Sequence, residues 1–192
     1  MKVTLLHHTP LDFIKDGIRM CWASQNLSDE MGPKDLALIN RIANKNKHSS
    51  VLRHSLYIFQ ITASTKTLLA FTRHKAGVEF SVQSSRYTTS KCASTMTFTP
   101  TRTAAINSKL DAIIEIVNEA ITEGASDDDI AMLLPQAYNY TFQVSMNAQA
   151  IQHFLSLRTS SHAHYDIQAV ADELFNQLPN EHKYLFEDSL CR

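Results

Sequence analysis

Helical spacing of apolar residues is the feature that restricts the fold of this chain most. The stretch 104–122 has apolar residues three or four positions apart, at Ile106, Leu110, Ile113 and Val117. That spacing puts them on one face of a long amphipathic helix. The run Gly-Ala-Ser at 124–126 follows and predicts its end. The spacing therefore favours a helix-rich chain.

Other helices are predicted on both sides of this one. Thr9 and Pro10 indicate the N-cap and first turn of a helix that reaches Cys21. Pro33 indicates the start of a second helix. Further helices are expected at 65–72, 140–157 and 162–177, and at 127–134, where Pro135 ends a short one.

Residues 55–62, SLYIFQIT, have the composition of a strand, rich in aromatic and β-branched residues. Residues 81–89 are expected to be extended or a loop that ends in a strand. The chain has 192 residues and no internal repeat or dividing linker. These features predict one domain, residues 1–192, of mixed α and β class.

Composition excludes several classes of protein. Hydrophobic residues make up 44%, with only 4 Gly and 5 Pro, so a disordered chain is not expected. The N-terminus has no apolar run of signal-peptide type, and no membrane span is predicted. The 3 cysteines are far apart and form no Cys-x-x-Cys, which favours a reducing, cytoplasmic setting.

Positive charge gathers in one part of the chain. Between Arg41 and Lys91 there are 9 of the 18 Lys and Arg residues but a single acid, Glu79. Such a surface attracts nucleotide phosphates or nucleic acid. A solvated face balanced by acids elsewhere, such as those at 127–129, explains the pattern equally well.

Within that stretch, Arg73, His74 and Lys75 place three donors side by side, and Ser84, Ser85 and Arg86 follow. Guanidinium groups bind phosphate through two hydrogen bonds and lysine binds it as a point charge. The pattern fits a phosphate-binding loop, and a plain charged surface loop is the alternative.

Two further features bear on the chemistry. Arg158 ends a predicted helix, where it either complements the helix dipole or points into a site and polarises a bound ring. No His or Cys spacing typical of a metal site occurs, so no metal is predicted. Dinucleotide, phosphate-loop and serine-hydrolase motifs are also absent from the sequence.

Three ordered blocks resemble the flavin-dependent thymidylate synthases, and most closely their shorter ε-proteobacterial-type members. The family pattern Arg-His-Arg, spacer, Ser-x-Arg-Tyr corresponds to Arg73-His74-Lys75 and Ser84-Ser85-Arg86-Tyr87. The upstream pattern His-x-Ser/Thr-x-x-Glu-His corresponds to His48, Ser50 and His54. The downstream block corresponds to Asn147-Ala148, Leu157-Arg158 and His162-Ala163. The resemblance covers nearly the whole chain.

This resemblance implies an α/β (α+β) fold, helix-rich, with a central, mostly antiparallel sheet. It implies a methyltransferase that converts dUMP to dTMP with FAD, NADPH and methylenetetrahydrofolate, as a homotetramer with shared active sites and no nucleic-acid or membrane partner. By resemblance, Arg158 is catalytic and activates the uracil ring. The other residues implied to hold dUMP are Arg73, Ser84, Ser85 and Arg86. Those implied to hold the flavin are His48, Ser50, Arg73, His74, Lys75, Asn147 and His153.

The sequence also departs from the family pattern. Lys75 and Gln149 stand where the pattern has arginine, Arg53 where it has glutamate, Ala70 where it has glutamine, and Ala131 where it has a phosphate-binding arginine. The spacer before Arg86 is also one residue longer. Each lost charge-assisted contact is worth roughly 1.5–3 kcal/mol. Arg53 and Lys47 are the candidates to compensate.

The departures leave two other functions to consider. A divergent homologue could keep the flavin or nucleotide site but use another pyrimidine, or have lost catalysis. A non-enzymatic nucleic-acid-binding module is less favoured, because the aromatic residues near the cationic stretch lack the pattern of a stacking platform.

Overall fold

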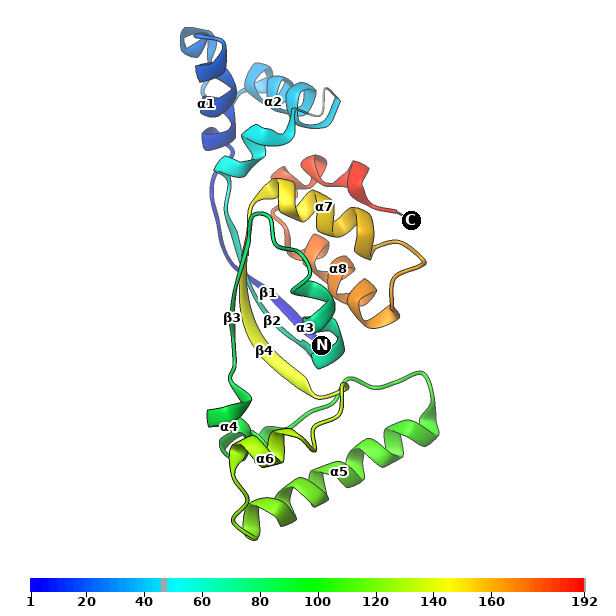
Figure 1. Ribbon diagram of the computed structural model, residues 1–192. Coiled ribbons are helices and arrows are strands. Elements are labelled where there is room, and N and C mark those ends of the chain that lie inside the picture. The colour runs from blue at the N-terminus through cyan, green and yellow to red at the C-terminus, as the bar shows by residue number, and fades with distance from the viewer. Residues whose placement is uncertain (46–47, 192) are drawn as a thin grey trace.

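The computed structural model describes residues 1–45 and 48–191, so Lys47 lies outside the described residues. Figure 1 shows an elongated molecule in which a long, twisted sheet joins two helical regions. Helices α3, α7 and α8 lie against one side of the sheet, while α4, α5 and α6 form a separate group at one end of it. Helices α1 and α2 occupy the opposite end.

The sheet has four strands in the order β1-β2-β4-β3, and every neighbouring pair is antiparallel. Its strands are β1 (Lys2–His8), β2 (Tyr57–Ser64), β3 (Val78–Val82) and β4 (Asn139–Met146). In the central pair, Tyr57 lies opposite Met146 and Ser64 opposite Asn139. The expected α+β class with a central antiparallel sheet is confirmed.

The main helices are α1 (Asp12–Cys21), α2 (Pro33–Asn40), α3 (Thr65–Phe71), α4 (Ser85–Cys92), α5 (Ala104–Thr122), α6 (Asp127–Ala131), α7 (Ala148–Arg158) and α8 (Tyr165–Gln177). Shorter turns of helix are η1 (Gln25–Leu27), η2 (Arg41–Lys45), η3 (Ser49–His54), η4 (Ala93–Thr95), η5 (Asn180–Leu185) and η6 (Glu187–Ser189). The helix predicted at 104–122 is confirmed with the same bounds.

Three local predictions were wrong. The first half of the helix expected at 140–157 is β4, because alternate residues Phe142, Val144 and Met146 are buried in the sheet. Residues 81–89 end β3 and then begin α4. Thr9 is not a helix cap, since its hydroxyl accepts from the Leu56 amide at 2.9 Å and α1 starts later.

Two apolar clusters hold the elements together. The larger lies between the sheet and α7 and α8, and includes Phe59, Ile61, Phe154 and Leu174, all with 0% exposure. The smaller joins α5 and α6 through Val117 and Ile130. The sheet thus carries a well-packed helical layer on one side, and that layer positions the turn after α3 and the residues of α7 that were singled out by sequence.

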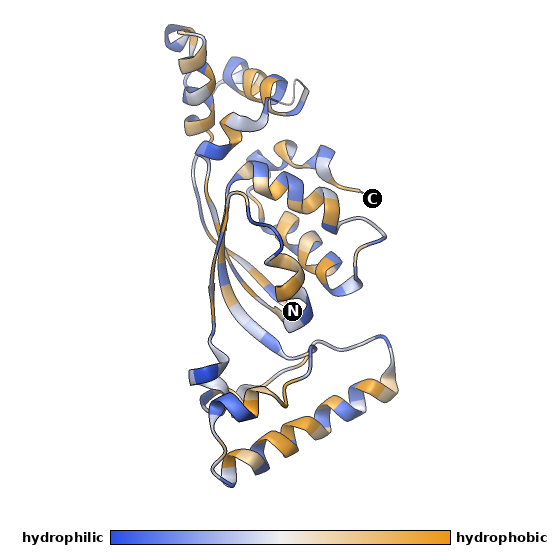
Figure 2. Cartoon of the chain, viewed as in Figure 1, coloured by the Kyte–Doolittle hydropathy of each residue, from blue (hydrophilic) through white to orange (hydrophobic). Residues whose placement is uncertain are grey.

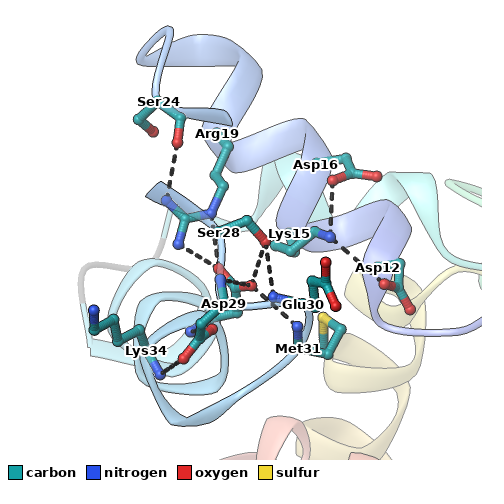
Figure 3. A network of polar contacts seen from close by, with 11 residues as sticks. Asp12, Lys15, Asp16, Arg19, Ser24, Ser28, Asp29, Glu30, Met31 and Lys34 are labelled. Atoms are coloured by element: carbon teal, nitrogen blue, oxygen red, sulfur yellow. Dashed lines mark hydrogen bonds and ion pairs between the residues drawn. The ribbon is translucent and has the colours of Figure 1, made fainter. Parts of the chain in front are cut away.

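A buried ion pair fixes α1 against α2 (Figure 3). Arg19 on α1 donates from Nε to Oδ1 of Asp35 on α2 at 2.7 Å, with a second bond from Nη2. The other carboxylate oxygen accepts from the Ser28 hydroxyl at 2.6 Å and from the Asp29 and Met31 amides. Burial by itself raises the pKa of Asp35, but these donors outweigh it and hold that pKa below its usual range.

Across the described ranges, the structure contains no helix that is both long and apolar enough to cross a membrane.

Candidate active site

A cavity of about 470 Å³ opens where η3, the turn after α3, the start of β3 and the start of α7 meet. It collects much of the sequence that was singled out for anion binding. Its lining residues are Arg53, Arg73, His74, Lys75, Ala76, Val78, Gln149, Ala150 and His153. No carboxylate occurs among these described lining residues, so the cavity is cationic and suits an anionic ligand.

The turn that carries Arg73 and Lys75 is shaped by a glycine. Gly77 has φ +71°, which a side chain rarely tolerates, and its carbonyl accepts from the Asn147 amide at 3.1 Å. A Cβ on Gly77 would stand 2.1 Å from Nδ2 of Asn147. The Asn147 side chain in turn caps α7 by accepting from the Ala150 amide at 2.8 Å. The cationic turn and the start of α7 are thereby held in contact.

Arg158, in the last helical turn of α7, contacts the end of α3 and the cationic turn that follows it. Its Nε donates to Nε2 of His74 at 3.1 Å, and its Nη2 donates to the Ala70 carbonyl at 3.1 Å. The second contact uses the backbone of Ala70 and therefore does not depend on the side chain at position 70. The Arg158 guanidinium is held in a fixed orientation, half-buried beside the cationic turn.

The His74 imidazole is 7% exposed and surrounded by rings. Its centroid lies 5.1 Å from that of Phe154 and 5.6 Å from that of His153. Burial, followed by the charges of Arg158 and His153, lowers the pKa of His74 to about 4. His74 is thus neutral at pH 7, which leaves Nε2 free to accept from Arg158 and puts the proton on Nδ1.

Two of the departures from the family pattern contact each other. Arg53 donates from Nε to Oε1 of Gln149 at 2.6 Å. Gln149 then donates from Nε2 to the Ser49 hydroxyl at 2.6 Å. Both departures line the cavity, although the sequence by itself presents them as separate losses. Their simultaneous change was the one signal in the sequence that could have paired them.

A second cavity of about 450 Å³ adjoins the first, and Gln149 and His153 line both. Its other lining residues are Ala43, Asn44, Ser49, Gln152, Ser156, Asp188 and Ser189. Two side-chain amides are fixed here by hydrogen bonds to backbone carbonyls. Gln152 donates to the Leu185 carbonyl at 2.6 Å, and Asn44 donates to the Tyr184 carbonyl at 2.9 Å. Apart from Gln149 and His153, no residue of this polar surface, which includes the carboxylate of Asp188, was singled out from the sequence.

The remaining predicted site residues lie elsewhere. His48 and Ser50 are exposed at the start of η3 and line neither cavity. Ser84, Ser85 and Arg86 lie at the start of α4, at the far end of β3 (Figure 1), a strand that spans about 15 Å. There Arg86 makes a two-bond ion pair with Asp128, at 2.9 and 3.2 Å. A single chain therefore presents two separate groups of predicted ligand residues.

No group of three or more His, Cys, Asp or Glu side chains that could hold a metal ion occurs within residues 1–45 and 48–191.

The family model described as "Thymidylate synthase complementing protein" matches residues 4–182. The flavin-dependent thymidylate synthase of Wolinella succinogenes is 36% identical and that of Helicobacter pylori 35%, over 97% and 99% of both chains, respectively. A crystal structure of the Helicobacter pylori enzyme with FAD and dUMP aligns over 100% of both chains with a TM-score of 0.93 and 32% identity. The chain belongs to the family of flavin-dependent thymidylate synthases.

Proposed function

We propose that this chain is a methyltransferase that converts dUMP to dTMP, with FAD as cofactor and NADPH and methylenetetrahydrofolate as co-substrates. The observation that carries the proposal is the fixed Arg158 guanidinium, bound by His74 and the Ala70 carbonyl beside a cationic cavity. The relatives that share the fold have FAD and dUMP bound.

The cavity fits the phosphate-bearing part of a flavin dinucleotide. Arg53, Arg73 and Lys75 offer three cations, and no acid among the described lining residues neutralises them. The rigid turn at Gly77 and the capped start of α7 hold these groups in place. When bound, FAD supplies the redox chemistry, and the protein positions the reactants.

Arg158 has the chemistry needed at the pyrimidine. Two of its nitrogens are committed to His74 and Ala70, while Nη1 has no partner among the described residues. We assign that nitrogen to a carbonyl or ring nitrogen of the uracil. A fixed cation there stabilises negative charge on the ring, which makes C5 more nucleophilic. Because His74 is neutral, it orients the guanidinium through a hydrogen bond without repelling its positive charge.

We propose that the active enzyme is a homotetramer in the cytoplasm, each chain forming one domain. Ser84, Ser85 and Arg86 follow β3, whereas the turn that contacts Arg158 precedes this strand, so a second chain would supply these residues to a nucleotide bound at Arg158. Figure 2 shows many hydrophobic residues along α5, at the α4–α6 end of the molecule. Ile106 and Ile116 on this helix are 45% and 49% exposed and Met132 is 86% exposed, which supports contacts with a second chain. We propose no nucleic-acid or membrane partner.

Ala131 favours one second candidate, a homologue with a changed pyrimidine or lost catalysis. It lies on α6 where the family pattern has a phosphate-binding arginine, and a methyl group binds no phosphate. Binding measurements with dUMP, dCMP and uridine nucleotides test the changed substrate, because tight dUMP binding excludes it; formation of dTMP tests whether catalysis is lost.

The deciding experiment is to purify the protein, record its absorption spectrum, and add dUMP, NADPH and methylenetetrahydrofolate. We expect flavin bands near roughly 450 nm, as for flavins in general, and formation of dTMP. A bound flavin without dTMP would favour the second candidate. No flavin, even after reconstitution with FAD, would contradict the first function and mean that the chain has kept the family fold but lost the family chemistry.

A further inference from the structure

Compared with the family pattern, this chain carries a positive charge at a different position in the cavity, on Arg53 and not at position 149. The family pattern places an acid at position 53 and an arginine at 149, whereas this chain has an arginine and a neutral amide. The two side chains come from elements 96 residues apart and meet at 2.6 Å. One cation is therefore kept at this edge of the cavity, but it now extends from η3 instead of α7.

The relocated charge has no acidic partner. Arg53 donates to a neutral amide, and its two terminal nitrogens have no partner within the described residues. Arg73 and Lys75 on the same cavity likewise form no ion pair in the described part of the chain. Three exposed cations that repel one another favour a ligand carrying more than one negative charge.

Gln149 is suited to hold that arginine where a second arginine could not. Its carbonyl oxygen accepts from Nε of Arg53, and its amide nitrogen is fixed by the Ser49 hydroxyl. An arginine has no acceptor and would repel Arg53. Occupation of Nε leaves the two terminal nitrogens as a fork, the geometry that binds phosphate with two hydrogen bonds.

We propose that Arg53 binds the pyrophosphate of the flavin dinucleotide in this chain, with Gln149 as the residue that positions it. This rests on the proposed function, since it names a ligand contact within the same site. The pyrophosphate is favoured over the single phosphate of dUMP because Arg73 and Lys75 flank the same cavity and add two more charges.

The test compares FAD dissociation constants of the wild type and Arg53→Gln, by flavin fluorescence on apoprotein. We expect Arg53→Gln to weaken FAD binding by about 10- to 100-fold, the loss typical of a charge-assisted bond. The difference should shrink in high salt, which screens charge but would not correct a packing defect. The FAD dissociation constant of Arg53→Lys should lie between those of the wild type and Arg53→Gln.

Two further variants complete the design. The exchange variant Arg53→Gln with Gln149→Arg restores one guanidinium to the pair and should bind FAD within about threefold of wild type. Arg41→Gln removes an exposed arginine that does not line this cavity and should leave FAD binding unchanged. Riboflavin, which lacks phosphate, should bind the wild type and Arg53→Gln equally.

Equal FAD affinity in the wild type and Arg53→Gln would overturn the role of Arg53 and leave the proposed function intact. Weakened dUMP binding with unchanged FAD binding would overturn the assignment to the pyrophosphate. An exchange variant as weak as Arg53→Gln alone would refute the idea that the two positions share one subsite. A wild type that binds no FAD would instead refute the proposed function.

Discussion

Two clusters of charge in this molecule are built in opposite ways. At the α1–α2 end, Arg19 is 5% exposed and Asp35 fully buried, and both carboxylate oxygens of Asp35 accept hydrogen bonds (Figure 3). In the cavity, Arg53, Arg73 and Lys75 are exposed and have no carboxylate among its described lining residues.

The difference distinguishes charged residues that stabilise the fold from charged residues that are available to bind a ligand. A buried ion pair recovers its desolvation cost only when every donor and acceptor is matched, as they are around Asp35. An unneutralised cationic cavity adds nothing comparable to stability and gains its free energy on binding an anion. Substitutions in the first cluster should therefore change stability and leave the chemistry intact, and those in the second should do the reverse.

The largest expected effect is on the buried pair. Asp35→Ala leaves the buried Arg19 without its ionic partner, with only the Ser24 carbonyl still accepting from Nη1, and should lower the free energy of unfolding by about 3–5 kcal/mol. Chemical denaturation measures this. Replacing the pair by Arg19→Met and Asp35→Leu should recover the part of the loss that comes from the unpaired buried charge, but not the part that comes from the donors to the other carboxylate oxygen. Asp16→Ala, which removes an exposed partner of Lys15, should have little effect. A loss below about 1 kcal/mol for Asp35→Ala would show that the pair is not structural.

The converse experiment is Arg158→Ala. Removing a fixed cation that stabilises charge on the reacting ring should lower kcat by about 10²–10³-fold or more. The melting temperature should change little, because Arg158 is half-buried and its partners Ala70 and His74 belong to well-packed elements. Assays of dTMP formation and thermal melting on one preparation separate the two effects. Unchanged turnover would refute the role of Arg158.

Periodicity predicted the parts of the fold where one signal dominates. The long α5 was placed correctly because its apolar face repeats over nineteen residues. The strand β4 was missed because Phe142 and Val144 also suit a helix that continues into α7, and only pairing with β2 decides between them. Likewise Thr9 resembles a cap, yet the Leu56 backbone, 47 residues away, binds its hydroxyl.

For the site, the sequence indicated which residues matter but not which of them meet. The Arg-His-Lys turn was found from its charges and its resemblance to a family motif. That His74 would be buried, neutral and bonded to Arg158 depends on the packing of α3 against α7, which has no local signature. The contact between Arg53 and Gln149 could not be predicted for the same reason, since it joins distant segments and only their joint departure from the family pattern linked them.

His74 shares a feature with each cluster. It lines the cationic cavity, but it is buried and must therefore stay neutral. Its pKa of about 4 lies below the value of 6.5 for an ordinary histidine. Between these values the unfolded chain binds more protons than the folded one, so stability is complete above about pH 6.5 and falls as pH drops towards 4. The loss from this group should reach about 3 kcal/mol.

The measurement for His74 is the free energy of unfolding between pH 7 and pH 4, in the wild type and in His74→Gln. The glutamine keeps an acceptor for Arg158 but does not titrate. Burial also lowers the pKa of His182 and of His164, so the wild type alone would not isolate His74. We expect a shallower pH dependence in the variant, and two identical profiles would contradict the low pKa of His74.

The smallest effect is expected at the exposed pair of Arg86 and Asp128, which lies between the two extremes. The carboxylate raises the pKa of Arg86 through a hydrogen bond, but both side chains are open to water, 66% and 55% exposed, so Asp128→Asn should barely change stability. If Arg86 contacts dUMP as we propose, it must first leave Asp128. Asp128→Asn should then tighten dUMP binding, by no more than about fivefold. Asp129→Asn is the matched control, because that carboxylate is bound by Ser126 instead. Weaker dUMP binding in Asp128→Asn would mean that the ion pair positions Arg86 for the nucleotide. Arg86 would then resemble Arg19, which depends on a carboxylate partner, and not the unpaired cations of the cavity.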